Sequence, residues 1–257
     1  MSYLDAIILG LVQGLTEFLP VSSSGHLVIA ENLLHAKIPG VLFELAVHFG
    51  TLMSVVIYFR RKILDLIKSL FIPAMKKERA MVFYLCIGTI PAVIIAILLK
   101  DSIEQAFSSP LVTSILLLVT GLILFSTAIP RRNEKDSTIG NSIMVGIGQA
   151  LAIFPGISRS GTSISFGLFS GLKPVAAAEF SFLLSIPAII GAIVFKANEI
   201  ATVNPAMIGQ YILGTTMSFL SGLAAVYFLL DIIRKGKFEY FGIYCTIVGF
   251  GGIIIFG

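Results

Sequence analysis

The sequence has few charged residues and only two cysteines. Asp, Glu, Lys and Arg make up 12% of the 257 residues, whereas 56% are hydrophobic and the mean hydropathy is +0.98. A water-soluble domain carries about 25% charged residues, so this chain lacks the surface of one. Cys86 and Cys245 fall in apolar runs and belong to no Cys-x-x-Cys or His-x-x-His pattern. A disulfide and a structural zinc or iron–sulfur site are therefore not expected.

Apolar runs near the length of a bilayer crossing fill most of the chain. A transmembrane helix needs about 20 mostly apolar residues. Four runs carry no charge and two more carry one acidic residue near the start (Glu44 and Glu179): Met81–Leu99, Leu111–Ile129, Met207–Leu230 and Tyr240–Gly257, then Val41–Phe59 and Val175–Phe195. We predict a single all-α integral membrane domain over residues 1–257 with six transmembrane helices. No basic segment precedes the first apolar run, so a cleavable signal peptide is not expected.

Basic residues cluster in three of the connections between these runs. The clusters lie in Arg60–Arg79, Arg131–Lys135 and Arg234–Lys237, whereas the connections near Lys100–Pro110 and Lys196–Pro205 hold one lysine each. The positive-inside rule assigns the three clusters to the cytoplasm. We therefore attribute the net charge of +4 to the basic residues that set the orientation of the chain in the membrane. No nucleic-acid partner is expected.

The first polar segment recurs in the second half of the chain. Gly10–His26 aligns without gaps with Gly146–Thr162, and 7 of the 17 positions are identical, where chance gives roughly one or two. Each half has one polar-centred segment followed by three apolar runs, with repeat one at about 1–130 and repeat two at about 140–257. If the polar segments Leu4–Leu34 and Ser142–Leu172 do not cross the membrane, the two halves have inverted topology.

Both polar segments are predicted to form re-entrant helix–turn–helix hairpins. Pro20 and the Pro155-Gly156 pair stop a helix at the serine–glycine turns. Non-helical backbone at membrane depth is tolerated only where protein buries it or where it lines a wet cavity. We therefore expect the two turns to meet near the midplane of the membrane, inside the protein.

The polar side chains at these turns suit an anionic ligand such as a phosphate. Helix N-termini attract anions, and Arg159 is the only guanidinium expected at that depth. A serine attacks only when a base takes its proton, and Glu17 and His26 are the candidate bases. A carboxylate could also hold a divalent metal. The residues expected to converge are Gln13, Glu17, Ser22, Ser23, Ser24 and His26 from the first hairpin, and Gln149, Ser158, Arg159, Ser160, Thr162 and Ser163 from the second.

Two motifs resemble those of a known family. QGLTEFLPVSSSGH (13–26) and PGISRSGTS (155–163) are similar to the signatures of the undecaprenyl-diphosphate phosphatases, the bacitracin-resistance family of bacterial membrane enzymes. The resemblance implies hydrolysis of undecaprenyl diphosphate to undecaprenyl phosphate and inorganic phosphate, which recycles the lipid carrier for peptidoglycan synthesis. It also implies an interdigitated inverted repeat, location in the bacterial inner membrane, and a divalent cation, Mg²⁺ or Ca²⁺, as cofactor.

The resemblance further implies roles for individual residues. Ser23 matches the serine favoured as nucleophile, His26 the motif histidine, and Arg159 the phosphate-binding arginine. Glu17 matches the motif acid and is the one candidate metal ligand, because Gln13 stands where the family allows Glu or Gln and cannot ligate a metal as a carboxylate would. Whether Ser23 or His26 attacks stays open. The other substrate-binding positions are Ser22, Ser158, Ser160, Thr162, Ser163 and Gln13.

The architecture alone leaves a second function open. A transporter or flippase for a phosphorylated lipid or an anion also uses inverted repeats with broken helices, although it needs no nucleophile–base pair. Glu17 and Arg159 could also form a buried ion pair that holds the hairpins together. The expected partners are a polyprenyl diphosphate lipid and the membrane, with a homodimer left open. The topology predicts that the first turn is reached from the outer face, and His35 and His48 receive no role.

Overall fold

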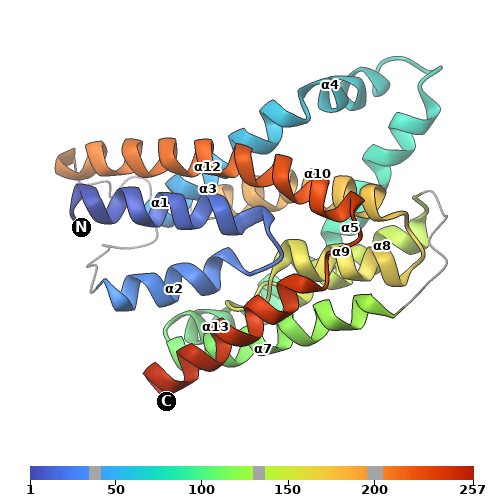
Figure 1. The fold of residues 1–257 in the computed structure, drawn as a ribbon. Coiled ribbons are helices and arrows are strands. Elements are labelled where there is room, and N and C mark those ends of the chain that lie inside the picture. Colours follow the sequence, from blue (N-terminus) through green and yellow to red (C-terminus); the bar gives the residue numbers. More distant parts are fainter. Residues whose placement is uncertain (35–41, 130–136, 196–204) are drawn as a thin grey trace.

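The structure is a computed structural model that describes residues 1–34, 42–129, 137–195 and 205–257. Every regular element in these ranges is a helix (Figure 1). The basic cluster at Arg131–Lys135 and His35 lie outside the described residues. The elements are α1 (Tyr3–Phe18), α2 (Ser23–Leu33), α3 (Leu42–Tyr58), α4 (Arg60–Ser69), α5 (Lys76–Leu98), α6 (Lys100–Phe107), α7 (Pro110–Phe125), η1 (Ser126–Ala128), α8 (Ile139–Leu151), α9 (Arg159–Phe169), α10 (Pro174–Phe195), η2 (Pro205–Met207), α12 (Ile208–Arg234) and α13 (Tyr240–Phe256).

The long apolar helices make the chain a polytopic membrane protein. Among the described residues, four helices are long and apolar enough to cross a membrane, namely α5, α7 continued by η1, α10, and η2 continued by α12. A fifth span results if α3 and α4 are counted together, although the chain bends by 78° between them. α3 and α13 have 17 residues each, slightly fewer than the roughly 20 that a crossing helix needs. The prediction of an all-α polytopic membrane protein is confirmed, and the count of six spans stays a prediction.

The first broken helix pair, α1 and α2, is interrupted by a short turn around Pro20. α1 ends at Phe18, and Leu19 is extended, as expected for a residue that precedes a proline. Ser22 caps α2, because its Oγ accepts a hydrogen bond from the Gly25 N–H at 3.3 Å. Ser22 has a φ of 70° and is the one non-glycine residue with positive φ in the described part of the chain. The turn therefore holds a conformation that L-residues rarely adopt.

The second broken pair, α8 and α9, repeats this cap. The Ser158 Oγ accepts a hydrogen bond from the Gly161 N–H at 3.1 Å, and Gly156 supplies the positive φ of 93° that a glycine adopts at no steric cost. The neighbouring helix α7 fixes the turn through Thr120. Its hydroxyl donates to the Gly156 carbonyl at 2.7 Å and accepts from the Ser158 N–H at 3.0 Å. The backbone from Gly156 to Ser158, just before Arg159, is thus hydrogen-bonded to Thr120 at both ends.

The first helix of each broken pair packs closely against a helix from the other half of the chain. A Cβ atom added at Gly10 of α1 would lie 3.0 Å from the Cα of Gly214 in α12. One added at Gly146 of α8 would lie 3.1 Å from the Cα of Gly88 in α5. Glycines at such crossings let two helix backbones approach each other. Because Gly10 and Gly146 are aligned positions of the sequence repeat, both halves use the same type of crossing.

The two turns lie against each other in the interior. Figure 1 shows the α1–α2 pair and the α8–α9 pair entering from opposite ends of the molecule. The Ser160 Oγ donates to the Leu19 carbonyl at 3.0 Å, and a Cβ atom at Gly25 would lie 3.0 Å from the Cα of Gly156. The ends of four helices, α1, α2, α8 and α9, therefore converge at one place.

Aromatic packing fixes α1 beside the point where the two turns meet. Phe18 contacts Phe182 of α10 edge-on, with the ring centroids 5.6 Å apart, and Phe182 also contacts Phe59 at 6.0 Å. All three rings are buried. Because well-packed side chains in a core permit little movement, the residue before Phe18 has a defined position relative to α10 and to Phe59 at the start of α4. That residue is Glu17.

Candidate active site

A buried carboxylate, Glu17, connects both hairpins. Its side chain is 6% exposed. Oε2 accepts hydrogen bonds from the Ser23 Oγ at 2.5 Å and from the Gln13 Nε2 at 3.0 Å. Oε1 accepts from the Arg159 Nη2 at 2.5 Å. A buried carboxylate has to be paired and hydrogen-bonded to remain charged, and here the partners are a nucleophilic hydroxyl, an amide and a guanidinium.

Arg159 reaches Glu17 from the first turn of α9. Its side chain is 15% exposed, and the Nη1 group lies 3.4 Å from the Ser181 carbonyl of α10. The guanidinium has further N–H groups that can bind a phosphate. The sequence alignment matches Arg159 with Ser23, and both side chains end on the same carboxylate. The ion pair between the two hairpins, which the sequence left open as an alternative role for Glu17 and Arg159, is present.

The three serines of the first turn have different surroundings. The Ser23 Oγ donates to Glu17, as described above. The Ser22 Oγ caps α2, and the Ser24 Oγ lies 3.4 Å from it. Ser22 is buried, whereas Ser23 and Ser24 are partly exposed. Ser23 is thus the serine that combines access with a hydrogen bond to a base, as serine nucleophiles require.

His26 has partners other than Glu17. Its Nδ1 lies 2.8 Å from the Ser22 carbonyl, and a carbonyl only accepts hydrogen bonds, so Nδ1 carries the proton. In the neutral ring, Nε2 then accepts from the Tyr244 hydroxyl of α13, also at 2.8 Å. The two rings are stacked with centroids 5.5 Å apart. These contacts orient His26 beside the turn and make Ser23, not His26, the partner of the carboxylate.

The hydroxyls of the second hairpin are buried and bonded within the protein. Thr162 donates to the Ser158 carbonyl at 2.7 Å. Ser163 donates to the Arg159 carbonyl at 2.6 Å and lies at the same distance from the Ser181 Oγ. Ser158 and Ser160 make the cap and the contact between turns described above. In this structure these four hydroxyls support the backbone that carries Arg159.

His48 of α3 is a site residue that the sequence analysis missed. Its Nε2 lies 3.7 Å from the Glu17 Oε2, and its Nδ1 lies 2.7 Å from the Glu44 carbonyl. The side chain is 28% exposed. An ionisable residue in a membrane-embedded helix is a functional candidate by default, and His48 stands in the apolar run Val41–Phe59. That signal could have identified it. Tyr244 and Thr120 were missed for a different reason, because only folding brings them to the turns.

Comparison with known proteins identifies the family of this chain. The family model described as "Bacitracin resistance protein BacA" matches residues 6–251, which is nearly the whole chain. The chain belongs to the bacitracin resistance protein BacA family.

Members of this family in several organisms are named undecaprenyl-diphosphatase. The protein of Carboxydothermus hydrogenoformans is 43% identical over 97% of this chain and 95% of its own length. The proteins of Syntrophotalea carbinolica and Korarchaeum cryptofilum are 42% and 41% identical over 97% of both chains. The likeness covers nearly the whole chain.

The side chains around Glu17 can be compared with the needs of a divalent cation. The described residues contain no group of three or more His, Cys, Asp or Glu side chains that could hold a metal. The Gln13 side chain is fully buried, and its Oε1 has no hydrogen-bond partner. Mg²⁺ is often bound by one or two carboxylates together with substrate phosphates. One carboxylate and one free amide oxygen, with substrate oxygens completing the shell, fit such an ion.

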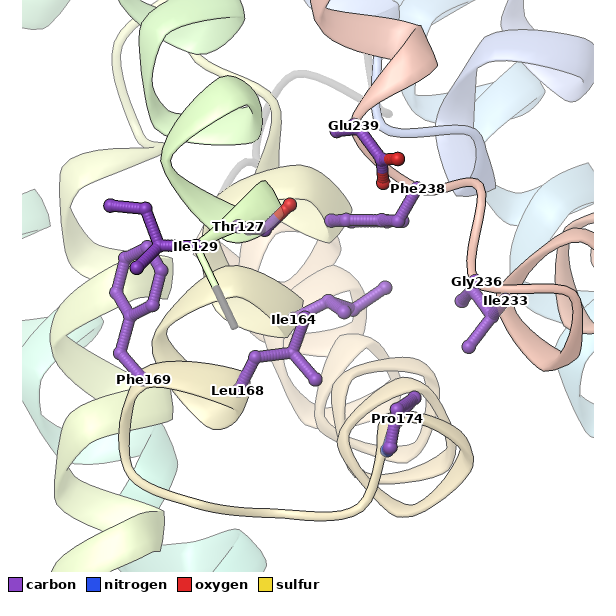
Figure 2. A pocket seen from close by; sticks show the side chains of 10 residues that line it. All are labelled: Thr127, Ile129, Ile164, Leu168, Phe169, Pro174, Ile233, Gly236, Phe238 and Glu239. Carbon is purple, nitrogen blue, oxygen red and sulfur yellow. The ribbon is translucent and has the colours of Figure 1, made fainter. Parts of the chain in front are cut away.

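A separate cavity of about 200 Å³ lies among η1, α9, the start of α10, the end of α12 and the segment before α13. Figure 2 shows its lining, which includes Ile164 and Leu168 of α9 together with Phe238 and Glu239. The lining residues include one carboxylate and no His, Lys or Arg. Since an anionic substrate needs positive or hydrogen-donating groups, this cavity does not suit a diphosphate. The positively charged guanidinium and the nucleophilic hydroxyl described above lie instead at the turns around Glu17.

Proposed function

We propose that this chain hydrolyses undecaprenyl diphosphate to undecaprenyl phosphate and inorganic phosphate. The observation that carries the proposal is the buried Glu17, which accepts a 2.5 Å hydrogen bond from the Ser23 hydroxyl and a 2.5 Å bond from the Arg159 guanidinium. Relatives that are 41–43% identical bear the name of this activity. A carrier of anions would need the guanidinium but not the nucleophile beside a base, so the pairing of Ser23 with Glu17 favours hydrolysis.

In the first step the Ser23 Oγ attacks the terminal phosphorus and Glu17 takes the hydroxyl proton. A new Oγ–P bond forms while the anhydride P–O bond breaks, and its electron pair leaves with undecaprenyl phosphate. Glu17 then passes the proton to an oxygen of the leaving phosphate. In the second step water attacks the phosphoserine, Glu17 takes a proton from that water, and the Ser23 Oγ leaves and receives the proton. Inorganic phosphate and the original serine result.

Arg159 orients the terminal phosphate and neutralises its charge. Phosphoryl transfer depends mainly on positioning and on charge stabilisation. Without substrate, the guanidinium lies on Oε1 of Glu17 while Ser23 lies on Oε2. A bound phosphate competes for the guanidinium, which weakens its grip on the carboxylate and makes Glu17 a stronger base. Binding of substrate thereby activates the nucleophile.

A divalent cation, Mg²⁺ or Ca²⁺ by family resemblance, would be held by Glu17 and the Oε1 of Gln13. When bound, it supplies positive charge to the diphosphate oxygens. His26, fixed between Ser22 and Tyr244, is proposed to hold the first turn in the conformation that directs Ser23 toward Glu17. Four hydroxyls are proposed to act on the phosphate indirectly, because their hydrogen bonds hold the backbone that positions Arg159: Ser158, Ser160, Thr162 and Ser163.

We further infer six transmembrane helices and two re-entrant hairpins in an inverted repeat, in the bacterial inner membrane. Three observations support the repeat: the matched caps at Ser22 and Ser158, the matched glycine crossings at Gly10 and Gly146, and the contact of the two turns. In this topology the first turn is reached from the outer face. Cysteine scanning with a membrane-impermeant thiol reagent in oriented vesicles tests the sidedness.

The activity is tested with purified protein in detergent and undecaprenyl diphosphate, measuring released phosphate. Ser23→Ala is expected to lower kcat by about a thousandfold or more, as for other serine nucleophiles. Ser24→Ala is the matched control, because this neighbouring hydroxyl contacts Ser22 and not Glu17. Full turnover by Ser23→Ala would remove Ser23 as the nucleophile. Absence of phosphate release from any prenyl diphosphate would favour transport instead.

A further inference from the structure

We propose that His48 is a direct ligand of the divalent cation, bound together with Glu17 and Gln13. The inference rests on the proposed function, since the cation belongs to that site, and it adds a nitrogen donor from α3. His48 faces the carboxylate with a separation of 3.7 Å between Nε2 and Oε2. It stands outside both hairpin motifs.

The hydrogen bond at the other ring nitrogen fixes which atom of His48 is free. Nδ1 lies 2.7 Å from the Glu44 backbone carbonyl, which can only accept, so Nδ1 carries the proton. In a neutral imidazole, Nε2, the ring nitrogen 3.7 Å from the Glu17 Oε2, then carries the lone pair. Histidines that bind metals usually have this arrangement, in which the second nitrogen donates to a carbonyl or carboxylate. The ring of His48 is therefore already oriented as a ligand.

The separation between Nε2 and Oε2 suits two ligands of one ion. It exceeds the 2.7–3.2 Å of a typical N–H···O hydrogen bond, so the two atoms are not bonded to each other directly. Two ligands at about 2.1 Å from one ion lie about 3.0 Å apart at a right angle and about 3.6 Å apart at 120°. The observed 3.7 Å lies just above this range.

Gln13 provides a third donor from an independent observation. Its side chain is completely buried, its Nε2 lies 3.0 Å from the Glu17 Oε2, and its Oε1 has no partner. A buried polar atom without a partner is unfavourable unless a ligand or water satisfies it. Rotation of the amide by 180° exchanges its oxygen and nitrogen and brings the free oxygen beside Glu17. The His48 Nε2 and the Gln13 amide then both lie within 3.7 Å of the Glu17 Oε2.

The donor set predicts a preference among cations. Mg²⁺ and Ca²⁺ favour oxygen ligands throughout, whereas an imidazole nitrogen favours ions such as Zn²⁺, and Mn²⁺ accepts both types of ligand. One nitrogen with two protein oxygens therefore favours Mn²⁺ over Mg²⁺ and Ca²⁺. Mn²⁺ is also a spectroscopic probe, because its electron spin senses a directly bound ¹⁴N nucleus.

The test measures Mn²⁺ binding to the full chain in detergent, after treatment with a chelator that is then removed. Titration followed by electron paramagnetic resonance gives the stoichiometry and affinity, and pulsed measurements detect ¹⁴N coupling. We expect about one Mn²⁺ per chain with imidazole ¹⁴N coupling, and tighter binding than Mg²⁺ in competition. His48→Ala should lose the coupling and weaken binding by at least tenfold. His48→Gln, which restores an oxygen donor, should recover much of the affinity without the coupling.

His26→Ala is the matched control, because both nitrogens of His26 have protein partners. It should keep the coupling. Bound Mn²⁺ without imidazole coupling in the wild type, or coupling that persists in His48→Ala, would overturn the inference, as would absence of Mn²⁺ binding. Phosphate release from the same preparations separates the two proposals. Turnover without ¹⁴N coupling would reject the role of His48 alone, whereas coupling without turnover would reject the proposed hydrolysis.

Discussion

The ion pair between Glu17 and Arg159 leads to a quantitative prediction about stability. Arg159→Ala removes the partner of Oε1 and leaves a carboxylate whose side chain is 6% exposed. Removing one member of a buried ion pair costs about 3–5 kcal/mol, because the other charge stays buried without compensation. For chains of 150–250 residues, each kcal/mol lowers Tm by roughly 2–4 °C. Arg159→Ala is therefore expected to lower Tm by roughly 6–20 °C.

The chain contains a suitable reporter of unfolding. Cys245 is buried, whereas Cys86 is exposed, so a thiol-reactive fluorescent dye in a Cys86→Ser background reports exposure of Cys245 on heating. The double variant Glu17→Gln with Arg159→Met removes both charges while it keeps side chains of similar size. Its Tm should exceed that of Arg159→Ala, because no uncompensated charge remains, although phosphate release is lost in both.

Two results would refute this reasoning. If Arg159→Ala unfolds at the wild-type temperature, then Glu17 does not depend on the guanidinium for its burial. If the double variant is as unstable as Arg159→Ala, the loss comes from packing around the arginine side chain and not from the charge left on Glu17. Measuring both variants in the same detergent keeps the comparison independent of the surrounding medium.

Three further predictions concern the backbone and the neighbours of the site. In Gly14→Ala, the new methyl group would overlap the Ser221 hydroxyl and lie 2.8 Å from the backbone nitrogen of Gly222. The free energy of unfolding is therefore expected to fall by about 1–3 kcal/mol. Gly191→Ala is the neutral control in the same thermal assay, because no atom lies within 4 Å of its added Cβ. Tyr244→Phe removes the hydroxyl 2.8 Å from His26 and should lower kcat/KM by about 3–10-fold, and an unchanged value would show that this contact does not support turnover. Thr120→Val removes both side-chain hydrogen bonds to the second turn and should lower stability by about 1–3 kcal/mol, whereas an unchanged Tm would mean that water replaces the hydroxyl.

The general fold was predictable because its signals are local. Long apolar runs report membrane helices, and Pro20 and Gly156 mark the helix breaks within the polar segments. The lengths of individual helices were less predictable. The basic residues after Phe59 start a separate helix, α4, at a bend of 78°, and no periodic pattern distinguishes that bend from a continuing helix.

The site was predictable where the chemistry lies within one motif. Glu17, Ser23 and Gln13 are within ten residues of one another, and their mutual hydrogen bonds follow from the helix and the turn that carry them. Contacts between distant elements carry no such signal. The approach of His48 to Glu17 depends on how α3 packs against α1, and a single sequence does not contain that information.

The repeat explains why one carboxylate can serve both hairpins. At the aligned positions Ser22 and Ser158, the same cap is formed by the same atom, although the two backbones differ, with a φ of 70° at Ser22 and of −73° at Ser158. At that next position the halves differ, with Ser23 in one and Arg159 in the other. Glu17 has no acidic counterpart, because Ile153 occupies the aligned position. A second carboxylate there would compete for the guanidinium. The asymmetry therefore gives the single carboxylate one oxygen for the nucleophile and the other for the group that holds the phosphate.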